Sequence, residues 1–137
     1  MVKVRLYLVR HGKTMFNTIG RAQGWSDTPL TAEGELGIQE LGIGLRETGL
    51  QFERAYSSDS GRTIQTMGII LEELGLQGKI PYRMDKRIRE WCFGSFDGAY
   101  DGDLFMGIIP RIFNVDHVHQ LSYAELAEGL VEVDTAG

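Results

Sequence analysis

Two hydrophobic periodicities alternate along the first two-thirds of the chain, and their order most constrains the fold. Apolar side chains at every second position predict a strand at residues 2–9, and short apolar runs predict strands at 52–57 and 80–84. Apolar residues at helical spacing predict a helix at about 32–48 and a second helix carrying the stripe from Ile64 to Leu74. This order favours a three-layer α/β/α fold with a mainly parallel sheet and right-handed crossovers.

Local signals place the remaining segments. Thr31 is an N-cap residue type directly before the first predicted helix. A polar loop is expected from the end of the first strand to Pro29. The glycine- and aromatic-rich residues 91–137 are interpreted as a loop or small cap that contains one helix, started by Ser122. We therefore expect residues 1–137 to form a single domain with the cap inside it.

Composition excludes several classes of protein. With 42% hydrophobic and 24% charged residues, and no apolar run of membrane-spanning length, the chain is typical of a soluble globular protein. The lone Cys92, expected to be a buried thiol, has no internal disulfide partner, which predicts a cytoplasmic location. Residues 1–89 hold 13 of the 14 Lys and Arg residues. This division argues against a nucleic-acid face and fits a cationic pocket for a small anion.

The triplet Arg10-His11-Gly12 ends the first predicted strand, where open α/β sheets place their ligands. Imidazole is a competent nucleophile near neutral pH, and guanidinium binds phosphate oxygens bidentately. Arg62 follows the second strand and Glu90 follows the third, so all of these groups are expected at one sheet edge. This combination of side chains suits attack on a phosphoryl group.

Other candidate sites are weaker. Gly12-Lys13-Thr14 resembles the end of a phosphate-binding P-loop, but that motif requires glycine where Tyr7 stands. His117 and His119 lack a third metal ligand at suitable spacing, so an exposed cap segment is the preferred interpretation. Trp25 and Trp91 are interpreted as packing residues. No metal or organic cofactor is expected.

An ordered series of motifs resembles the histidine phosphatase superfamily, the phosphoglycerate mutase-like proteins. The matching residues run from position 4 to about 98. They are Leu8-Val9-Arg10-His11-Gly12, Asn17, Gln23-Gly24-Trp25, Asp27, Pro29-Leu30-Thr31, Gly34, Tyr56-Ser57-Ser58, Arg62, Gln65-Thr66 and Glu90.

The resemblance implies a role for each matching residue. His11 would be the phosphorylated nucleophile, and Arg10 and Arg62 would clamp the phosphoryl oxygens. Glu90 would protonate the leaving alkoxide and later deprotonate water.

Three further residues would bind phosphate or substrate by hydrogen bonds. They are Asn17, Gln23 and Gly24, the last two through their backbone. The resemblance also implies a phosphoglycerate mutase-like fold.

Two features depart from the family pattern. The family site contains a second histidine after a later strand, whereas the other histidines here are His117 and His119 in the cap. The family sheet has six strands in the order 3-2-4-1-5-6, and only three are predicted here. We therefore expect a longer chain that lacks its C-terminal strands here, or a strand and histidine supplied by another chain.

The resulting functional prediction is a phosphatase that hydrolyses a small phosphorylated metabolite through a phosphohistidine. The alternatives are a phosphoglycerate mutase and a non-catalytic module that binds a phosphate ligand or a protein. The substrate and the oligomeric state, including a homo-oligomer, are left open. Apolar side chains between Phe93 and Met106 fit either a partly hydrophobic pocket wall or loop packing.

Overall fold

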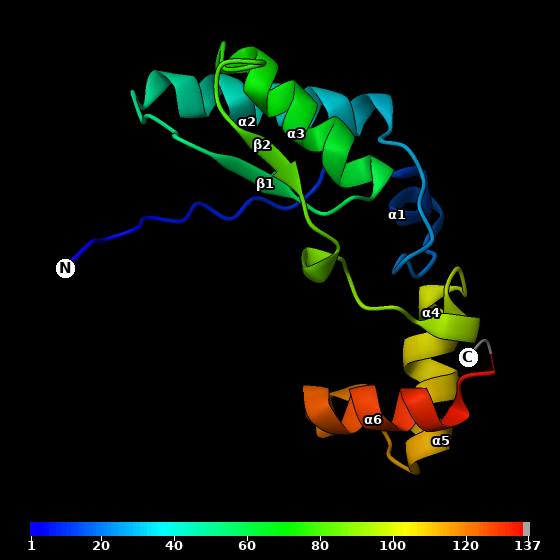
Figure 1. The fold of residues 1–137 in the computed structure, drawn as a ribbon. Helices are drawn as coiled ribbons and strands as arrows, with labels where there is room; N and C mark the ends of the chain where they lie inside the picture. The colour runs from blue at the N-terminus through cyan, green and yellow to red at the C-terminus, as the bar shows by residue number, and fades with distance from the viewer. Residues whose placement is uncertain (136–137) are drawn as a thin grey trace.

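A two-stranded parallel sheet with two helices packed on it forms one end of the molecule. The computed structural model describes residues 1–135 (Figure 1). Strand β1 (Ala55–Ser57) pairs in parallel with β2 (Tyr82–Met84). Helices α2 (Ala32–Glu47) and α3 (Gly61–Glu73) lie side by side along this sheet. The predicted helices and the second and third strands are therefore confirmed, with the strands shorter than expected.

Helix α2 begins and packs as its sequence dictates. The Thr31 side chain accepts a hydrogen bond from the Gly34 amide at 3.0 Å, which caps the first turn. On the face toward α3, a Cβ added at Gly42 would lie 2.7 Å from Cβ of Glu73. Glycine at this position therefore allows the two helices to approach closely.

Helix α3 is capped by a residue distant in sequence. Its own N-cap, Ser60, makes no capping hydrogen bond through its side chain. Instead, the Asp27 carboxylate accepts the amides of Gly61 at 2.8 Å and Arg62 at 3.3 Å. The negative charge also favours the positive end of the helix dipole. Asp27 thus joins the loop before α2 to the start of α3.

The predicted strand at residues 2–9 is wrong for this structure. This segment is extended but unpaired, and Val2 and Leu8 are 90% and 94% exposed. The Tyr7 ring of this segment lies edge-on to the Phe52 ring, with 5.4 Å between the ring centroids. A strand needs a hydrogen-bonded neighbour, and the resemblance places the first strand beside the fourth and fifth. Within residues 1–135, the sheet consists of β1 and β2, and neither pairs with this segment.

The loop expected before Pro29 contains a short helix, α1 (Met15–Ile19). Thr14 and Asn17 form a capping box, in which each side chain accepts the other residue's amide. Gly20 ends the helix with φ of 68°, a left-handed conformation that favours glycine. The helix was missed because it is too short to show an apolar period.

The cap is helical rather than loop-like. Its core is a cluster in which Leu104 and Ile109 are fully buried against Leu126, Leu130 and Ala22. The predicted start of the cap helix at Ser122 is confirmed: Ser122 is the N-cap of α6 (Tyr123–Val133) and forms a capping box with Glu125. The cap elements are α4 (Asp101–Asp103), a π-helical turn (Leu104–Ile108), α5 (Ile109–Phe113) and α6 (Tyr123–Val133).

Three short 3₁₀ turns complete the described structure. They are Lys86–Ile88, Gly94–Phe96 and Val118–Gln120. Residues 136 and 137, the last two of the predicted cap segment, lie outside the described residues. Within residues 1–135, no helix is both long and apolar enough to cross a membrane.

Candidate active site

The backbone around His11 is fixed by contacts with both helices. The Gly12 amide donates to the Thr66 hydroxyl at 3.0 Å, and that hydroxyl donates to the Arg62 carbonyl at 2.8 Å. A Cβ added at Gly12 would lie 2.9 Å from Cγ1 of Ile38. Glycine is therefore required for this loop to lie against α2 while it is hydrogen-bonded to α3.

The His11 imidazole is held in one tautomer. Its Nδ1 lies 2.8 Å from the carbonyl oxygen of Gly12. Because a carbonyl oxygen can only accept, Nδ1 carries the proton and Nε2 keeps its lone pair. Burial lowers the pKa of His11; the bond to Gly12 opposes this, and the net pKa lies below 6.5. The ring is therefore neutral at neutral pH, as a nucleophile requires.

Three of the predicted site residues act electrostatically on this ring. The positive charges of Arg62 and Arg10 lower the pKa of His11, whereas the negative charge of Glu90 raises it. The charges of Arg10, Arg62 and Glu90 therefore lie within electrostatic range of His11. They come from the segment before the first helix, from α3 and from the segment after β2.

Arg62 is 2% exposed, and acceptors surround most of its guanidinium group. Nη1 donates to the Ser26 carbonyl at 2.9 Å and to Asp27 at 3.1 Å, and Nη2 donates to the Gly24 carbonyl at 2.8 Å. Its Nε is buried and has no partner within the described residues. A buried donor without an acceptor is unfavourable, so this N–H is available to an anion.

Asn17 and Gln23 belong to a hydrogen-bonded network centred on Thr14. The side-chain oxygen Oδ1 of Asn17 accepts hydrogen bonds from the Thr14 hydroxyl at 2.9 Å and from the Thr14 backbone amide at 3.0 Å. The Gln23 side chain donates to the Thr14 hydroxyl at 3.1 Å and accepts from Thr28 at 2.6 Å. In this structure, both predicted substrate ligands make contacts that shape the loop.

Glu90 is exposed, and its surroundings position it. Its Oε1 accepts the amide of Trp91 at 2.9 Å, and its carbonyl oxygen accepts the Trp25 indole N–H at 3.1 Å. The Arg89 guanidinium lies 4.6 Å from the centroid of the Trp25 ring and pairs with Asp59 at 2.5 Å. Trp25, interpreted from sequence as a packing residue, is 56% exposed and supports the backbone of Glu90.

Asp97 is a structural residue of the site that sequence reasoning missed. Its carboxylate accepts the amides of Gly24 at 3.2 Å, Trp25 at 2.9 Å and Ser26 at 3.0 Å. Burial raises the pKa of Asp97, but hydrogen bonds from Ser26, Trp25 and Gly24 outweigh it, so the net pKa is lowered. The Gly24 amide, predicted to bind phosphate, is thus already paired. The only sequence signal for Asp97 is an acid directly before Gly98.

Three residues of the cap carry metal-binding or thiol chemistry. His117 and His119 are exposed, as expected. Cys92 is a free, exposed cysteine, so the expectation of a buried thiol was wrong. Among residues 1–135, no group of three or more His, Cys, Asp or Glu side chains is placed to hold a metal ion.

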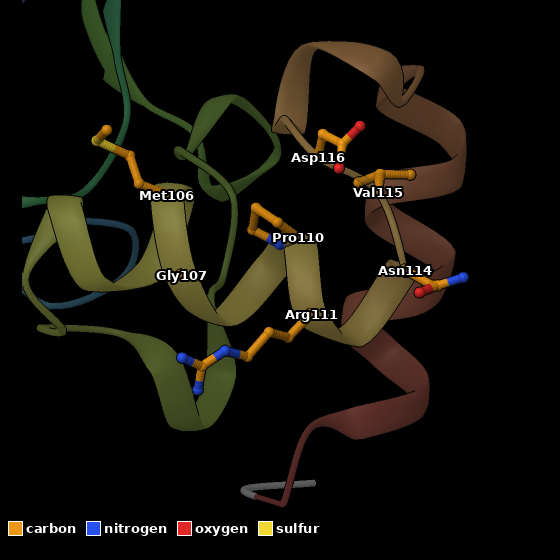
Figure 2. Close-up of a pocket in the computed structure, with 7 residues that line it drawn as sticks. All are labelled: Met106, Gly107, Pro110, Arg111, Asn114, Val115 and Asp116. Atoms are coloured by element: carbon orange, nitrogen blue, oxygen red, sulfur yellow. The ribbon is translucent and has the colours of Figure 1, made fainter.

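A cavity of about 380 Å³ lies within the cap, but it includes none of the predicted site residues. Figure 2 shows that the side chains of Arg111, Asn114 and Asp116 point in different directions. Because these polar groups do not converge on one point, the cavity offers no evident binding chemistry.

Comparison with known proteins agrees with this geometry. The family model of the histidine phosphatase superfamily (branch 1) matches residues 6–104. The "Probable phosphoglycerate mutase GpmB" of Salmonella choleraesuis is 48% identical over 60 residues, which is 44% of this chain and 27% of that protein.

Two solved structures are also similar. The phosphoglycerate mutase from Bacillus anthracis matches with a TM-score of 0.79 at 35% identity, over 90% of this chain and 54% of that one. A candidate alpha-ribazole-5'-P phosphatase from Escherichia coli matches with a TM-score of 0.60 at 27% identity, over 71% of this chain and 45% of that one. The predicted phosphoglycerate mutase-like α/β fold is confirmed. The chain spans about half the length of these structures.

Proposed function

We propose, on the premise that the chain belongs to the histidine phosphatase superfamily, that it hydrolyses phosphomonoesters through a phosphohistidine at His11. The observation that carries this proposal is the hydrogen bond from His11 Nδ1 to the Gly12 carbonyl. It leaves the lone pair of Nε2 available for attack on phosphorus. The lowered pKa of His11 keeps that lone pair free of a proton at neutral pH.

The two arginines would bind the phosphoryl group during transfer. The buried Nε of Arg62 needs an acceptor, and a phosphoryl oxygen would supply one. Carbonyls of the 24–26 loop hold the rest of that guanidinium, so it needs no reorganisation as charge develops. Arg10 is exposed and would add a second positive charge from the same loop as the nucleophile.

Glu90 would exchange protons with the leaving group and with water. As Nε2 of His11 bonds to phosphorus, the ester P–O bond breaks and a protonated Glu90 gives its proton to the alkoxide. The carboxylate then takes a proton from water as the water oxygen attacks the phosphohistidine. The N–P bond breaks, inorganic phosphate leaves, and His11 regains its lone pair.

The names of several relatives support a second candidate, a phosphoglycerate mutase. In that reaction a substrate hydroxyl, rather than water, would accept the phosphoryl group from His11. The nucleophile, the arginines and the acid would keep the same roles. The two candidates therefore differ in the acceptor.

The experiment measures release of inorganic phosphate from a panel of phosphomonoesters. We expect release by the protein and its loss in His11→Ala, while His117→Ala, at an exposed histidine of the cap, retains it. Equal low release by the protein and by His11→Ala would favour the non-catalytic alternative. Interconversion of the phosphoglycerates without phosphate release would identify the mutase.

A further inference from the structure

A second cavity adjoins the proposed acid and is built almost entirely from apolar side chains. It has a volume of about 460 Å³. It lies where the segment after β2 meets the cap, and its lining residues are Glu90, Trp91, Phe93, Phe105, Tyr123 and Leu126. Glu90 is the one charged residue of this lining. A cavity that joins a proton donor to aromatic rings can hold the organic part of an ester.

We propose that this cavity is the leaving-group subsite and that it selects phosphomonoesters of apolar, preferably aromatic, alcohols. The inference rests on the proposed function, because it places the phosphoryl group at His11. An alkoxide protonated by Glu90 must lie beside that carboxylate as the P–O bond breaks. Its carbon skeleton would then extend over the aromatic side chains that share the cavity with Glu90.

The floor of the cavity is fixed by the packing of the cap. Leu126 is buried in the core cluster of the cap. The rings of Phe93 and Phe105 pack edge to face, 6.1 Å between centroids, and both contact that cluster. A preformed apolar surface binds a ring without the cost of ordering flexible side chains.

The rim is more accessible and can be altered without disturbing the core. Tyr123, the first residue of α6, is 81% exposed and meets Trp91 edge to face at 5.7 Å. Substitution of Tyr123 removes one wall of the cavity but no buried contact of the cap. It is therefore the position at which the subsite can be tested.

Charge determines which substrates the cavity disfavours. No lysine or arginine lines it, and the neighbouring Arg89 is paired with Asp59. The carboxylate of a phosphoglycerate would lose its hydration against the aromatic rings without gaining a cationic partner. The cavity thus favours an apolar ester over the substrate of a mutase.

The first experiment compares benzyl phosphate with glycerol 3-phosphate, because both leaving groups are alkoxides of similar basicity. Burial of a ring of this size predicts a kcat/KM at least about tenfold higher for benzyl phosphate. Equal or lower kcat/KM for benzyl phosphate would overturn the proposal.

The second experiment uses three variants with the same two substrates. Tyr123→Ala should raise KM for benzyl phosphate about fivefold to tenfold, leave its kcat nearly unchanged and spare glycerol 3-phosphate. Tyr123→Phe should keep the KM of the unaltered protein. Val131→Ala is the matched control, because Val131 is 77% exposed on the same helix and outside the cavity. A KM rise equal for both substrates would indicate a general structural effect and refute the subsite.

A binding measurement separates failure of the subsite from failure of the proposed function. Benzylphosphonate and methylphosphonate have C–P bonds that phosphatases do not hydrolyse, so calorimetry can compare their Kd values without turnover. We expect benzylphosphonate to bind about tenfold more tightly, and Tyr123→Ala to remove most of that difference. Equal Kd values overturn the subsite whatever the activity, whereas equal phosphate release by the protein and by His11→Ala refutes only the catalytic proposal.

Discussion

The surroundings of His11 and the cap are stabilised in opposite ways. Outside the cap, in the part of the molecule that holds His11, the buried side chains include many polar ones: Thr14, Thr28, Ser57, Ser58, Arg62 and Thr66. In the cap, they are aliphatic: Leu104, Ile109, Leu126 and Leu130. A hydrogen bond constrains the direction in which a side chain points, whereas apolar packing constrains the volume that a side chain fills. The first region is thus suited to orienting reacting groups, and the second to shaping a surface.

This contrast predicts different consequences for substitution in the two regions. A change near His11 that preserves size or charge should still alter the direction of a hydrogen bond and reduce activity. A change in the core of the cap should mainly reduce the free energy of unfolding.

Arg62→Lys tests whether geometry matters more than charge near His11. Lysine keeps the positive charge, but its single ammonium group cannot bond the Ser26 and Gly24 carbonyls and also present an N–H in the position of the Arg62 Nε. We expect kcat/KM for phosphomonoester hydrolysis to fall about a thousandfold.

The control is Arg111→Lys, at the one arginine of the cap. It should leave kcat/KM unchanged, and circular dichroism should show that both variants are folded. If Arg62→Lys keeps kcat/KM within about threefold of the unaltered protein, the guanidinium has no directional role.

Leu104→Ala tests the apolar side of the comparison. Leu104 is fully buried in the cap core, so its truncation leaves a cavity and should lower the free energy of unfolding by about 3 kcal/mol. Urea denaturation measures this loss. Met106→Ala, two residues away and 83% exposed, should change it by less than about 0.5 kcal/mol. Similar losses for both variants would show that the cap lacks a specific core.

The same contrast explains what the sequence could and could not predict. Helices α2 and α3 were predictable because their apolar stripes and the Thr31 cap are local signals. The 2–9 segment has the clearest alternation of apolar residues, yet it forms no strand because pairing depends on a partner outside the segment. The cap was interpreted as loose because glycines conceal helices whose stability comes from tertiary packing.

The candidate site was predictable to a similar degree. Residue type and position relative to strands selected His11, Arg10, Arg62 and Glu90, and the charges of the last three act on the pKa of His11; their roles remain predictions. The hydrogen-bond partner of the Gly24 amide was not predictable. This partner, Asp97, is 73 residues away in sequence, and the residues around Asp97 contain no motif that predicts this hydrogen bond.

Asp97→Asn tests the junction between the two regions. An asparagine side chain keeps one acceptor oxygen but replaces a carboxylate that accepts four backbone amides, so we expect a loss of about 2 kcal/mol in unfolding free energy at pH 7. Because the pKa of Asp97 is lowered in the folded state, its stabilisation is present above its ordinary pKa of 3.8. That stabilisation is lost as pH falls through the lower folded value.

The difference between the unaltered protein and Asp97→Asn, measured by urea denaturation at several pH values, should therefore shrink below about pH 3.8. Asp116→Asn is the matched control, because Asp116 is exposed in the cap and its substitution should leave the urea midpoint at pH 7 unchanged. A loss for Asp97→Asn that is the same at every pH would show that charge is not involved.

The smallest expected effect is a shift in the titration of His11. Proton NMR should give a pKa below 6.5, with the resonance assigned by its absence from His11→Ala. In the pH profile of kcat/KM, the fall on the acid side should have its midpoint at the pKa measured by NMR, because only the neutral His11 ring attacks phosphorus. Removal of a neighbouring charge should move this pKa in a direction set by its sign. Arg10→Ala should raise it, Glu90→Gln should lower it, and Arg111→Ala should leave it in place.

The direction of each pKa shift depends on the charge of the neighbouring group and its position relative to His11. These measurements therefore test the arrangement of the site without requiring catalytic turnover. Two opposite shifts require both a cation and an anion to lie within a short electrostatic range of one imidazole. A pKa of 6.5 or above, or shifts of the same sign in Arg10→Ala and Glu90→Gln, would place these groups elsewhere. Both shifts should also decrease as salt is raised, because Arg10 and Glu90 are exposed and their fields are screened.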